Sequence, residues 1–338
     1  MMAANVEQKL PVLPQSKLVK TEYLGLENSI PLVISPQSDA VDLIAWAAGE
    51  QQFIENSLVR HGALLFRNFD VSEAHVFEQF VKAISGELIE YSERTSPRSS
   101  VTGRVYTSTD YPASESIFPH NESSYNVTFP MKIFFFCHTP ATRGGSTPIA
   151  DTRKVFQRID PRIRARFVEE KYLYVRNFDS DLGLPWQTVF QTTDKATVES
   201  YCRNAGIECE WRGEDRLRTR QVRAAVARHP RTHEWVWFNH ATFFHISTLE
   251  PRVRDALLKM VTEEDLPNNT YYGDGSRIEP AALDALRAAY QQELIAFPWH
   301  KGDILMLDNM LTAHARQPFE GPRKILTAMS EPYNWDSI

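Results

Sequence analysis

The stretch ELIAFPWHKGDILMLDNMLTAHARQPFEGPRKILTAM at residues 293–329 is the most informative part of the chain for the fold. Three runs in it, at 293–299, 304–309 and 323–329, are rich in aliphatic and aromatic residues and predict strands. The sequence Lys301-Gly302-Asp303 between the first two runs predicts a turn. The C-terminal part of the protein is therefore expected to consist of strands that follow one another closely.

Strand patterns continue upstream of this stretch, and helical patterns precede most of them. Further strands are expected at 63–69, 132–138 and 172–178, and in a hairpin formed by 219–229 and 234–240. Helices are expected at 40–60, from the N-cap Ser72 to Gly86, after the caps Asp151 and Asp160, and at about 250–262 and 280–293. Early helices followed by many strands favour a β-sandwich or barrel core with flanking helices over a doubly wound sheet.

The composition narrows the class of protein. The 338 residues carry a net charge of −6 with an isoelectric point of about 6.0, which argues against nucleic acid as the main partner. Three cysteines without CxxC spacing argue against a disulfide framework and a structural zinc site. The chain has no GxGxxG or GxxxxGK(S/T) motif, no apolar run of roughly 18 residues, and no apolar signal-peptide core near its start. We therefore expect a cytoplasmic globular protein with no membrane partner.

One short motif carries metal-ligand chemistry, because His120-Asn121-Glu122 is the only H-x-D/E sequence in the chain. If these residues lie on a strand, positions i and i+2 point to the same face and can bind one ion. His314 follows the strand expected at 304–309, and Arg323 opens the next strand nine residues later. Two histidines and one carboxylate form the facial triad of non-haem Fe(II) oxygenases, which leaves positions open for a 2-oxo acid and O2. The far carboxylate of such a co-substrate needs a fixed cation, and the planar fork of arginine suits it.

Four segments that include these residues resemble the TauD/TfdA, or taurine dioxygenase/clavaminate synthase-like, superfamily of Fe(II)- and 2-oxoglutarate-dependent oxygenases. They are FPHNESSYN (118–126), PATRGGSTPIADTRKVF (140–156), NTYYGDGS (269–276) and FPWHKGDILMLDNMLTAHARQPFEGPRKILTAM (297–329). The resemblance covers roughly residues 60–335, and within the superfamily it is nearest to the syringomycin-type enzymes that hydroxylate amino acids for peptide natural products. It implies a mainly β fold with flanking helices, the double-stranded β-helix or jelly roll.

The resemblance also implies roles for individual residues. The matches to the iron ligands are His120, Glu122 and His314. Arg323 and Thr147 match the residues that bind the distal carboxylate of 2-oxoglutarate. Lys324 is a competing candidate, because adjacent strand residues face opposite ways and only one of the pair can point inward. We favour Arg323 for its bidentate geometry.

Three more residues are candidates for substrate contact, namely Arg316, Asn239 and Thr327. Arg316 lies two residues after His314, where a structural ion pair is an equally good interpretation. Thr327 occupies the position, four residues after Arg323, at which the family often has a second arginine.

The implied reaction is hydroxylation of an unactivated C–H bond with Fe(II), 2-oxoglutarate and O2, which yields succinate and CO2. The expected substrate is an amino acid, free or tethered to a carrier protein, in natural-product biosynthesis. Desaturation or cyclisation by the same chemistry stays open as an alternative. So do a non-catalytic jelly-roll binding protein and a zinc hydrolase with the same three ligands. Assembly into a homo-oligomer is also left open.

Residues 1–20 are expected to form an N-terminal extension, and residues 21–338 a single catalytic domain. Two long polar stretches, 91–116 and 179–195, are expected to form lids over the metal, because loops of this length in a compact domain usually have a function. The segment 212–231 contains seven arginines and is interpreted as a solvated sheet edge. A nucleic-acid patch and a docking site for an acidic carrier protein are the alternatives for this segment.

Overall fold

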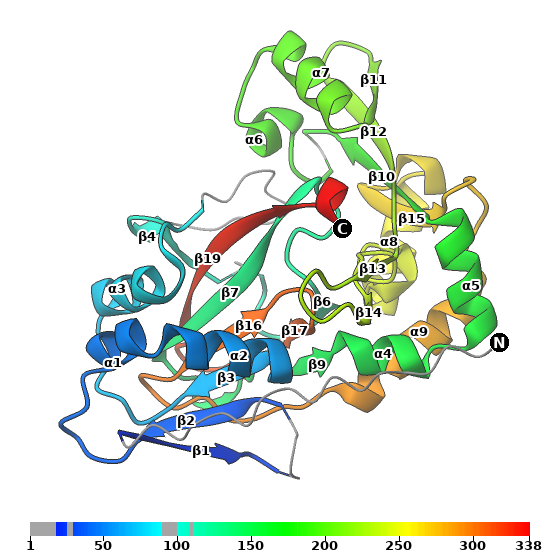
Figure 1. Cartoon of the computed structure of the whole chain (residues 1–338). Helices are drawn as coiled ribbons and strands as arrows, with labels where there is room; N and C mark the ends of the chain where they lie inside the picture. Colours follow the sequence, from blue (N-terminus) through cyan, green and yellow to red (C-terminus); the bar gives the residue numbers. More distant parts are fainter. Residues whose placement is uncertain (1–17, 26–29, 90–99, 109–110, 181) are drawn as a thin grey trace.

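The structure is a computed structural model, and it describes residues 18–25, 30–89, 100–108, 111–180 and 182–338. Its largest element is an eight-stranded sheet with the long strands β7 and β19 near its centre (Figure 1). All neighbouring strands of this sheet are antiparallel except β2 and β3. In spatial order the strands are β1 (Val19–Tyr23), β2 (Leu32–Pro36), β3 (Ala63–Phe66), β16 (Ile304–Asp308), β7 (Thr128–Thr139), β19 (Lys324–Asn334), β5 (Val105–Thr107) and β4 (Ser100–Thr102).

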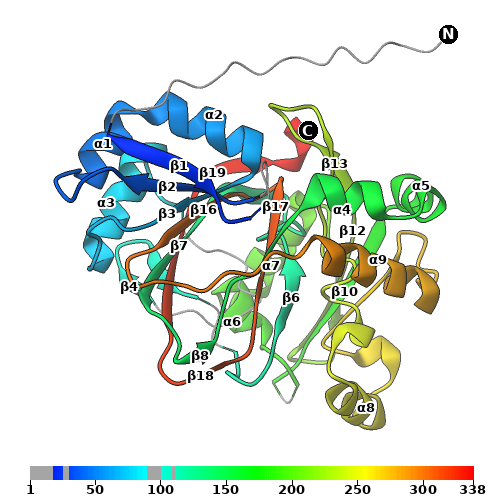
Figure 2. The same cartoon turned by 90° about the horizontal axis from the view of Figure 1, so that it is seen from below.

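A three-stranded sheet of β6 (Ile117–His120), β17 (Thr312–Arg316) and β9 (Ile149–Asp151) lies across from β7 and β19 (Figure 2). Ile133 and Phe135, on one face of β7, share a hydrophobic cluster with Ile149 of β9, so the two sheets enclose a common core. The opposite face of β7 carries Phe134 and Phe136, which belong to a different cluster. This alternation is expected of a strand that is covered on both faces. Two facing sheets with flanking helices are the mainly β architecture that the sequence predicts.

Three helices cover the outer face of the large sheet, namely α1 (Leu43–Gly49), α2 (Gln51–His61) and α3 (Ala74–Ser85) (Figure 1). Trp46, Phe77 and Phe80 from α1 and α3 belong to the cluster on that face. The sequence predicts one helix over 40–60, but the structure divides it at Glu50. The prediction of Ser72 as an N-cap is wrong, because α3 begins after Glu73 and has no side-chain cap hydrogen bond.

A separate four-stranded sheet contains β11 (Glu208–Arg212), β12 (Arg216–Arg223), β10 (Tyr172–Phe178) and β15 (Asn268–Tyr272) in that order. Two small pairs are β13 (Val226–Arg228) with β14 (Trp235–Trp237), and β18 (Phe319–Glu320) with β8 (Arg143–Gly144). The other helices are α4 (Thr152–Arg158), α5 (Pro161–Glu170), α6 (Trp186–Phe190), α7 (Lys195–Asn204), α8 (Pro251–Met260) and α9 (Pro280–Glu293). Asp151 and Asp160 cap α4 and α5 through their carboxylates, as predicted.

Two strand predictions are wrong because alternating burial does not specify a pairing partner. Residues 219–229 and 234–240 do not form one hairpin: β12 pairs with β10 and β11, and only the short β13 pairs with β14. At 293–299 the structure has no strand, only a single bridge between Ile149 and Ile295. Phe297 and Trp299 are nevertheless buried, so the pattern there reports burial rather than sheet pairing.

The arginine-rich segment 212–231 also differs from the prediction. β12 is an inner strand of its sheet, not an edge. Its arginines form ion pairs with nearby acids: Arg216 with Asp179, Arg218 with Asp265, and Arg220 with Glu208 and Glu210. Much of the positive charge of β12 is therefore compensated by neighbouring carboxylates, which weakens the interpretation of the segment as a phosphate-binding patch.

The expected N-terminal extension and lids fall only partly within the described residues. Residues 1–17, 90–99 and 109–110 lie outside them, and with them much of the lid expected at 91–116. In the stretch 179–195, α6 buries Trp186 and Val189 in a hydrophobic cluster. This part is packed rather than an open polar loop, and its role as a lid stays a prediction. No helix within the described ranges has both the length and the apolar character needed to cross a membrane.

Candidate metal centre

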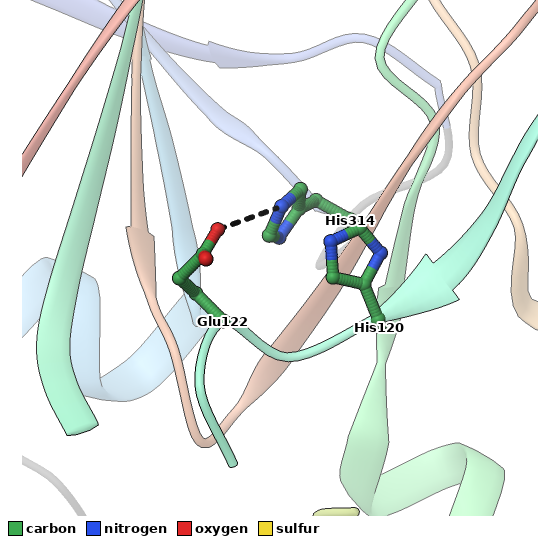
Figure 3. A group of neighbouring side chains, drawn as sticks. All are labelled: His120, Glu122 and His314. Carbon is green, nitrogen blue, oxygen red and sulfur yellow. Dashed lines mark ion pairs between the residues drawn. The ribbon is translucent and has the colours of Figure 1, made fainter. Parts of the chain in front are cut away.

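Three predicted ligands come together between the small sheet and the turn that follows β6 (Figure 3). His120 ends β6 and lies directly opposite His314 of β17 in the antiparallel pairing. One ligand atom from each of the two histidines and Glu122 lies within 4.8 Å of the others, and His314 Nε2 is 3.9 Å from Glu122 Oε2. The expectation that Glu122 shares a strand face with His120 is wrong, because the strand has ended. The turn at 122–125 brings the carboxylate back toward the histidines instead.

The side chains are oriented as a metal requires. His120 Nδ1 lies 2.9 Å from the carbonyl oxygen of Phe118. Since a carbonyl only accepts hydrogen bonds, Nδ1 carries the proton and Nε2 keeps the lone pair for an ion. Glu122 and His314 are both buried. Two imidazoles and one carboxylate held this closely fit a divalent transition metal such as iron or zinc.

Asn309, which follows β16, holds the backbone of Glu122 in place. Its Oδ1 accepts the Glu122 N–H at 2.8 Å, and its Nδ2 donates to the carbonyl oxygens of Glu122 at 2.9 Å and Pro130 at 2.8 Å. The Asn309 side chain is completely buried. These bonds join the turn that carries one ligand to the segment that leads into β17, which carries another. Asn309 is not among the residues predicted from the sequence, although its place in MLDNM, directly after a strand, is a signal for a side chain that organises a turn.

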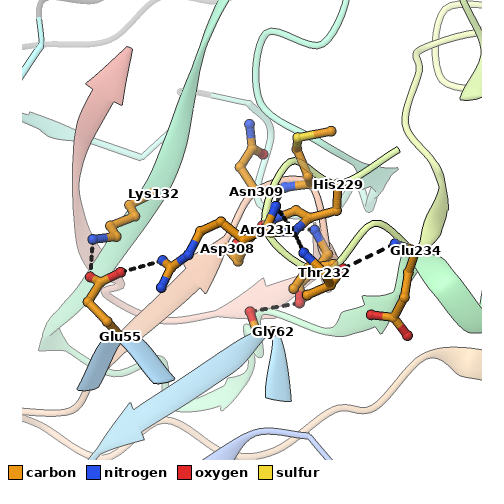
Figure 4. A network of polar contacts seen from close by, with 12 residues as sticks. Glu55, Gly62, Lys132, His229, Arg231, Thr232, Glu234, Asp308 and Asn309 are labelled. Carbon is orange, nitrogen blue, oxygen red and sulfur yellow. Dashed lines mark hydrogen bonds and ion pairs between the residues drawn. The ribbon is translucent and has the colours of Figure 1, made fainter. Parts of the chain in front are cut away.

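Buried Asp308 and His229 support the same segment from the other side (Figure 4). Asp308 Oδ1 accepts the N–H groups of Met310 and Leu311, both at 3.0 Å, and Oδ2 lies 3.0 Å from His229 Nε2. His229 Nδ1 accepts the backbone N–H groups of residues 231 and 232, so Nε2 donates to Asp308. His229 is therefore structural and stays outside the metal group.

A narrow cavity next to the histidines contains the residues predicted for 2-oxoglutarate. Arg323 Nη2 lies 3.3 Å from Thr147 Oγ1, and Arg323 Nε donates to the Gly145 carbonyl at 2.8 Å. Both side chains line the cavity together with His120 and His314. Burial and the neighbouring Arg316 guanidinium lower the pKa of Arg323 to about 10.

Arg323 is charged at neutral pH and makes no ion pair with a carboxylate among the described residues. A partly buried cation of this kind is expected to attract an anion. Lys324, the competing candidate, is exposed and does not line this cavity.

The three residues predicted to contact substrate lie in different surroundings. Arg316 lines the narrow cavity, but its guanidinium donates to the carbonyl oxygens of Tyr111, Pro112 and Glu115. Thr327 lines the same cavity, and its buried Oγ1 has no hydrogen-bond partner among the described residues. Asn239 lines neither cavity at the histidines. Its side-chain amide donates a hydrogen bond to the Ala225 carbonyl and accepts one from the Ala241 N–H. Its placement gives no support to a role in substrate binding.

A larger cavity of about 530 Å³ opens on the other side of His120 and Glu122. Phe243 forms part of its wall, with its ring centroid 4.6 Å from that of His120. His240 is fixed there by a 2.7 Å hydrogen bond between its Nδ1 and Ser124 Oγ, and burial holds its pKa well below the ordinary value. The protein thus has a narrow cavity with a cationic side chain and a larger aromatic cavity, and His120 lines both.

Comparison with known proteins assigns the chain to an enzyme family. A family model described as "Taurine catabolism dioxygenase TauD, TfdA family" matches residues 29–329, so the chain belongs to this family of dioxygenases. The dapdiamide synthesis protein DdaC of Enterobacter agglomerans is 42% identical over 279 residues, which are 82% of this chain and 85% of DdaC. A clavaminate synthase-like protein of Arabidopsis thaliana is 30% identical over 319 residues, which are 88% of this chain and 93% of that protein.

Solved structures share the fold. PvcB of Pseudomonas aeruginosa has a TM-score of 0.57 at 16% identity, covering 94% of this chain and 93% of PvcB. AAD-2, solved with Mn(II) and N-oxalylglycine, has a TM-score of 0.53 at 14% identity, covering 92% and 96% of the two chains. The jelly-roll prediction is thereby confirmed. Family membership likewise confirms the predicted superfamily and the enzyme class, a non-haem iron, 2-oxoglutarate-dependent oxygenase.

Proposed function

We propose that this oxygenase hydroxylates an amino acid, free or tethered to a carrier protein, in the biosynthesis of a natural product. The metal ligands are His120, Glu122 and His314, and 2-oxoglutarate is held by Arg323 and Thr147. The observation that carries the proposal is that the ligand triad borders both cavities: His120 lines both, Glu122 lines the aromatic cavity, and His314 lines the cavity that holds Arg323. DdaC is a dapdiamide synthesis protein, and this similarity supports a role for the enzyme in natural-product biosynthesis.

The residues of the narrow cavity fit 2-oxoglutarate. Arg323 presents a guanidinium without a carboxylate partner among the described residues, and Thr147 adds a hydroxyl 3.3 Å away. The partnerless hydroxyl of Thr327 is a further polar group at the wall. A cation flanked by hydroxyls is suited to a carboxylate, because charge-assisted hydrogen bonds are the strong ones.

The chain contributes binding and orientation to the reaction. His120, Glu122 and His314 would hold the ion through two imidazoles and one carboxylate, a ligand set that leaves positions available for reactants. Arg323 and Thr147 hold the far carboxylate of 2-oxoglutarate and so fix how the molecule lies against the histidines. When bound, iron, 2-oxoglutarate and O2 supply the oxidation that converts C–H to C–OH and yields succinate and CO2. The larger cavity positions the substrate carbon and excludes water around it.

Desaturation, cyclisation, a zinc hydrolase and a non-catalytic jelly roll are the other outcomes that the test must separate. Purified protein would be incubated with Fe(II), 2-oxoglutarate and a panel of free and carrier-bound amino acids, following succinate release and product mass. We expect succinate formation that requires 2-oxoglutarate and O2, and a product 16 mass units heavier than the substrate. Product formation without 2-oxoglutarate, or no iron binding in an anaerobic titration, would contradict the proposal.

The ligand assignment has its own test. His120→Ala and Glu122→Ala should each remain folded and lose iron-dependent turnover, because each removes a ligand. His300→Ala is the matched control, since His300 is exposed and lines neither cavity. Near-wild-type turnover in either ligand variant would show that the residue has been assigned wrongly. We also propose that residues 21–338 form one catalytic domain.

A further inference from the structure

The larger cavity has an unusual charge distribution for a site that is expected to receive an amino acid. The described residues that line it include Glu115 and Glu250 in addition to the candidate ligand Glu122, but no lysine and no arginine. His245, also at the wall, adds no positive charge at neutral pH, because burial and the nearby Arg287 lower its pKa to about 4. At neutral pH the charged side chains among the described lining residues are therefore carboxylates, and the nearby Arg316 guanidinium is engaged by the backbone carbonyls of Tyr111 and Glu115.

Glu115 is the carboxylate with the clearest need for a partner. Its backbone carbonyl accepts a hydrogen bond from Arg316 Nη2 at 2.7 Å, which fixes this part of the wall. Its side chain is partly buried and forms no ion pair with any described residue. A partly desolvated carboxylate is stabilised by an opposite charge that approaches it.

The position of Glu250 argues against the main alternative for this cavity, which is binding of an anionic ligand at the N-terminus of α8. A helix N-terminus normally attracts anions through its free N–H groups. Here the Glu250 carboxylate already accepts the N–H groups of Arg252 at 2.8 Å and Val253 at 3.4 Å. The N-terminus of α8 is thus already capped by the carboxylate of a residue that lines the same cavity.

Aromatic rings form much of the remaining wall. Phe244 stacks on Tyr174 with ring centroids 4.4 Å apart and lies 5.3 Å from Tyr125. Both Phe244 and Tyr125 line the cavity, as does Phe243. Phe244 is held between Tyr174 and His240, whose ring centroid lies 4.7 Å away, so these rings give the wall a fixed, apolar surface rather than a second polar anchor.

We propose that this cavity recognises its substrate through a protonated amine, with Glu115 as the direct counter-charge, and that the substrate presents no free carboxylate to the described wall. This inference rests on the proposed function and specifies the substrate class of that site. A free amino acid has both charges, and its carboxylate would meet acidic residues there. An amino acid whose carboxyl group is blocked, as an amide, ester or thioester, keeps the ammonium group and avoids that repulsion.

The test is equilibrium binding, which does not depend on turnover. The protein loaded with Mn(II) and 2-oxoglutarate would be titrated with matched panels of the twenty amino acids: free amino acids, amino-acid amides, N-acetyl amino-acid amides and N-acetyl amino acids. We expect the tightest ligand to be an amino-acid amide, bound at least about tenfold more tightly than the matched free, neutral and anionic forms. Tighter binding of any other panel, or no binding by any amide, would overturn the inference.

A charge-removing variant tests the named residue. Glu115→Gln keeps the shape of the side chain and should weaken binding of the best amide by about 10- to 100-fold, the usual contribution of a charge-assisted hydrogen bond. Binding of its N-acetylated form should change little. Glu214→Gln, at an exposed position that lines neither cavity, is the matched control. Equal weakening of charged and neutral ligands would overturn the role of Glu115.

The same samples separate this inference from the proposed function. Binding of Mn(II) and 2-oxoglutarate is measured before any amine is added. If neither binds, the proposed function fails. If both bind and the amides do not, only the substrate class is wrong.

Discussion

Asn309 provides the most direct test of how the fold positions the candidate metal ligands. Replacing it with leucine keeps a similar volume and removes three hydrogen bonds, one from the Glu122 N–H and one each to the carbonyl oxygens of Glu122 and Pro130. Leucine leaves the three partner groups without this hydrogen bond, and at about 1–3 kcal/mol for each buried group the free energy of unfolding should fall by about 3–9 kcal/mol. A domain in the upper part of the ordinary range of about 5–15 kcal/mol tolerates such a loss, and the urea unfolding transition of the variant shows directly whether it folds.

The metal affinity should fall as well, because the freed turn no longer holds the Glu122 carboxylate near the histidines. Loss of a residue that orients a metal ligand typically weakens binding by about 10- to 100-fold. Titration of the apoprotein with Mn(II) measures the metal affinity, with free Mn(II) quantified by its electron paramagnetic resonance signal. Urea unfolding of the apoprotein measures the stability term separately.

The two measurements together decide the role of Asn309. The control is Asn204→Leu, since the exposed Asn204 side chain has no hydrogen bond to a described residue. It should change neither quantity by much. A variant Asn309→Leu that loses stability but binds Mn(II) as the wild type does would refute the positioning role and leave Asn309 as a structural residue only.

Three further outcomes are expected. Arg323→Lys should raise the KM for 2-oxoglutarate by about 10- to 100-fold in initial-rate measurements of succinate release, because lysine cannot form two parallel bonds, whereas Lys324→Ala should leave it unchanged. Thr327→Val should leave apoprotein stability in urea within about 1 kcal/mol, because the buried hydroxyl has no partner among the described residues to lose; a larger destabilisation would show that the hydroxyl is engaged. In excess chloride, mass spectrometry should find no chlorinated main product, because Glu122 as the proposed third ligand would fill the position that chloride needs, and a chlorinated product would exclude Glu122 as a ligand.

The sequence was a good guide wherever local pattern and structure depend on the same residues. The strand at 172–178 coincides with β10, and Asp160 followed by proline marks the start of α5. The resemblance to a known family brought together His120, Glu122 and His314 before any geometry was available, and the structure places them within bonding range of one ion.

Predictions from local residue patterns were wrong where a distant segment of the chain determines the structure. Phe297 and Trp299 alternate like strand residues, yet among the described residues their segment has no pairing partner beyond one bridge. Glu122 reaches the histidines from a turn, because Asn309, far away in the chain, holds that turn in shape. Neither fact can be read from the local spacing of residues, because both depend on which segments meet in space.

His120 and His314 lie opposite each other on paired strands, and this arrangement links metal binding to the stability of the folded protein. The proposed centre exists only after β6 and β17, roughly two hundred residues apart, have found their register, so the ion binds the completed fold and not its precursors. An ion present at 100 times its dissociation constant then adds about 2.7 kcal/mol to the free energy of unfolding. The apoprotein therefore has the lower free energy of unfolding, and a larger fraction of it is unfolded at equilibrium and open to proteolysis.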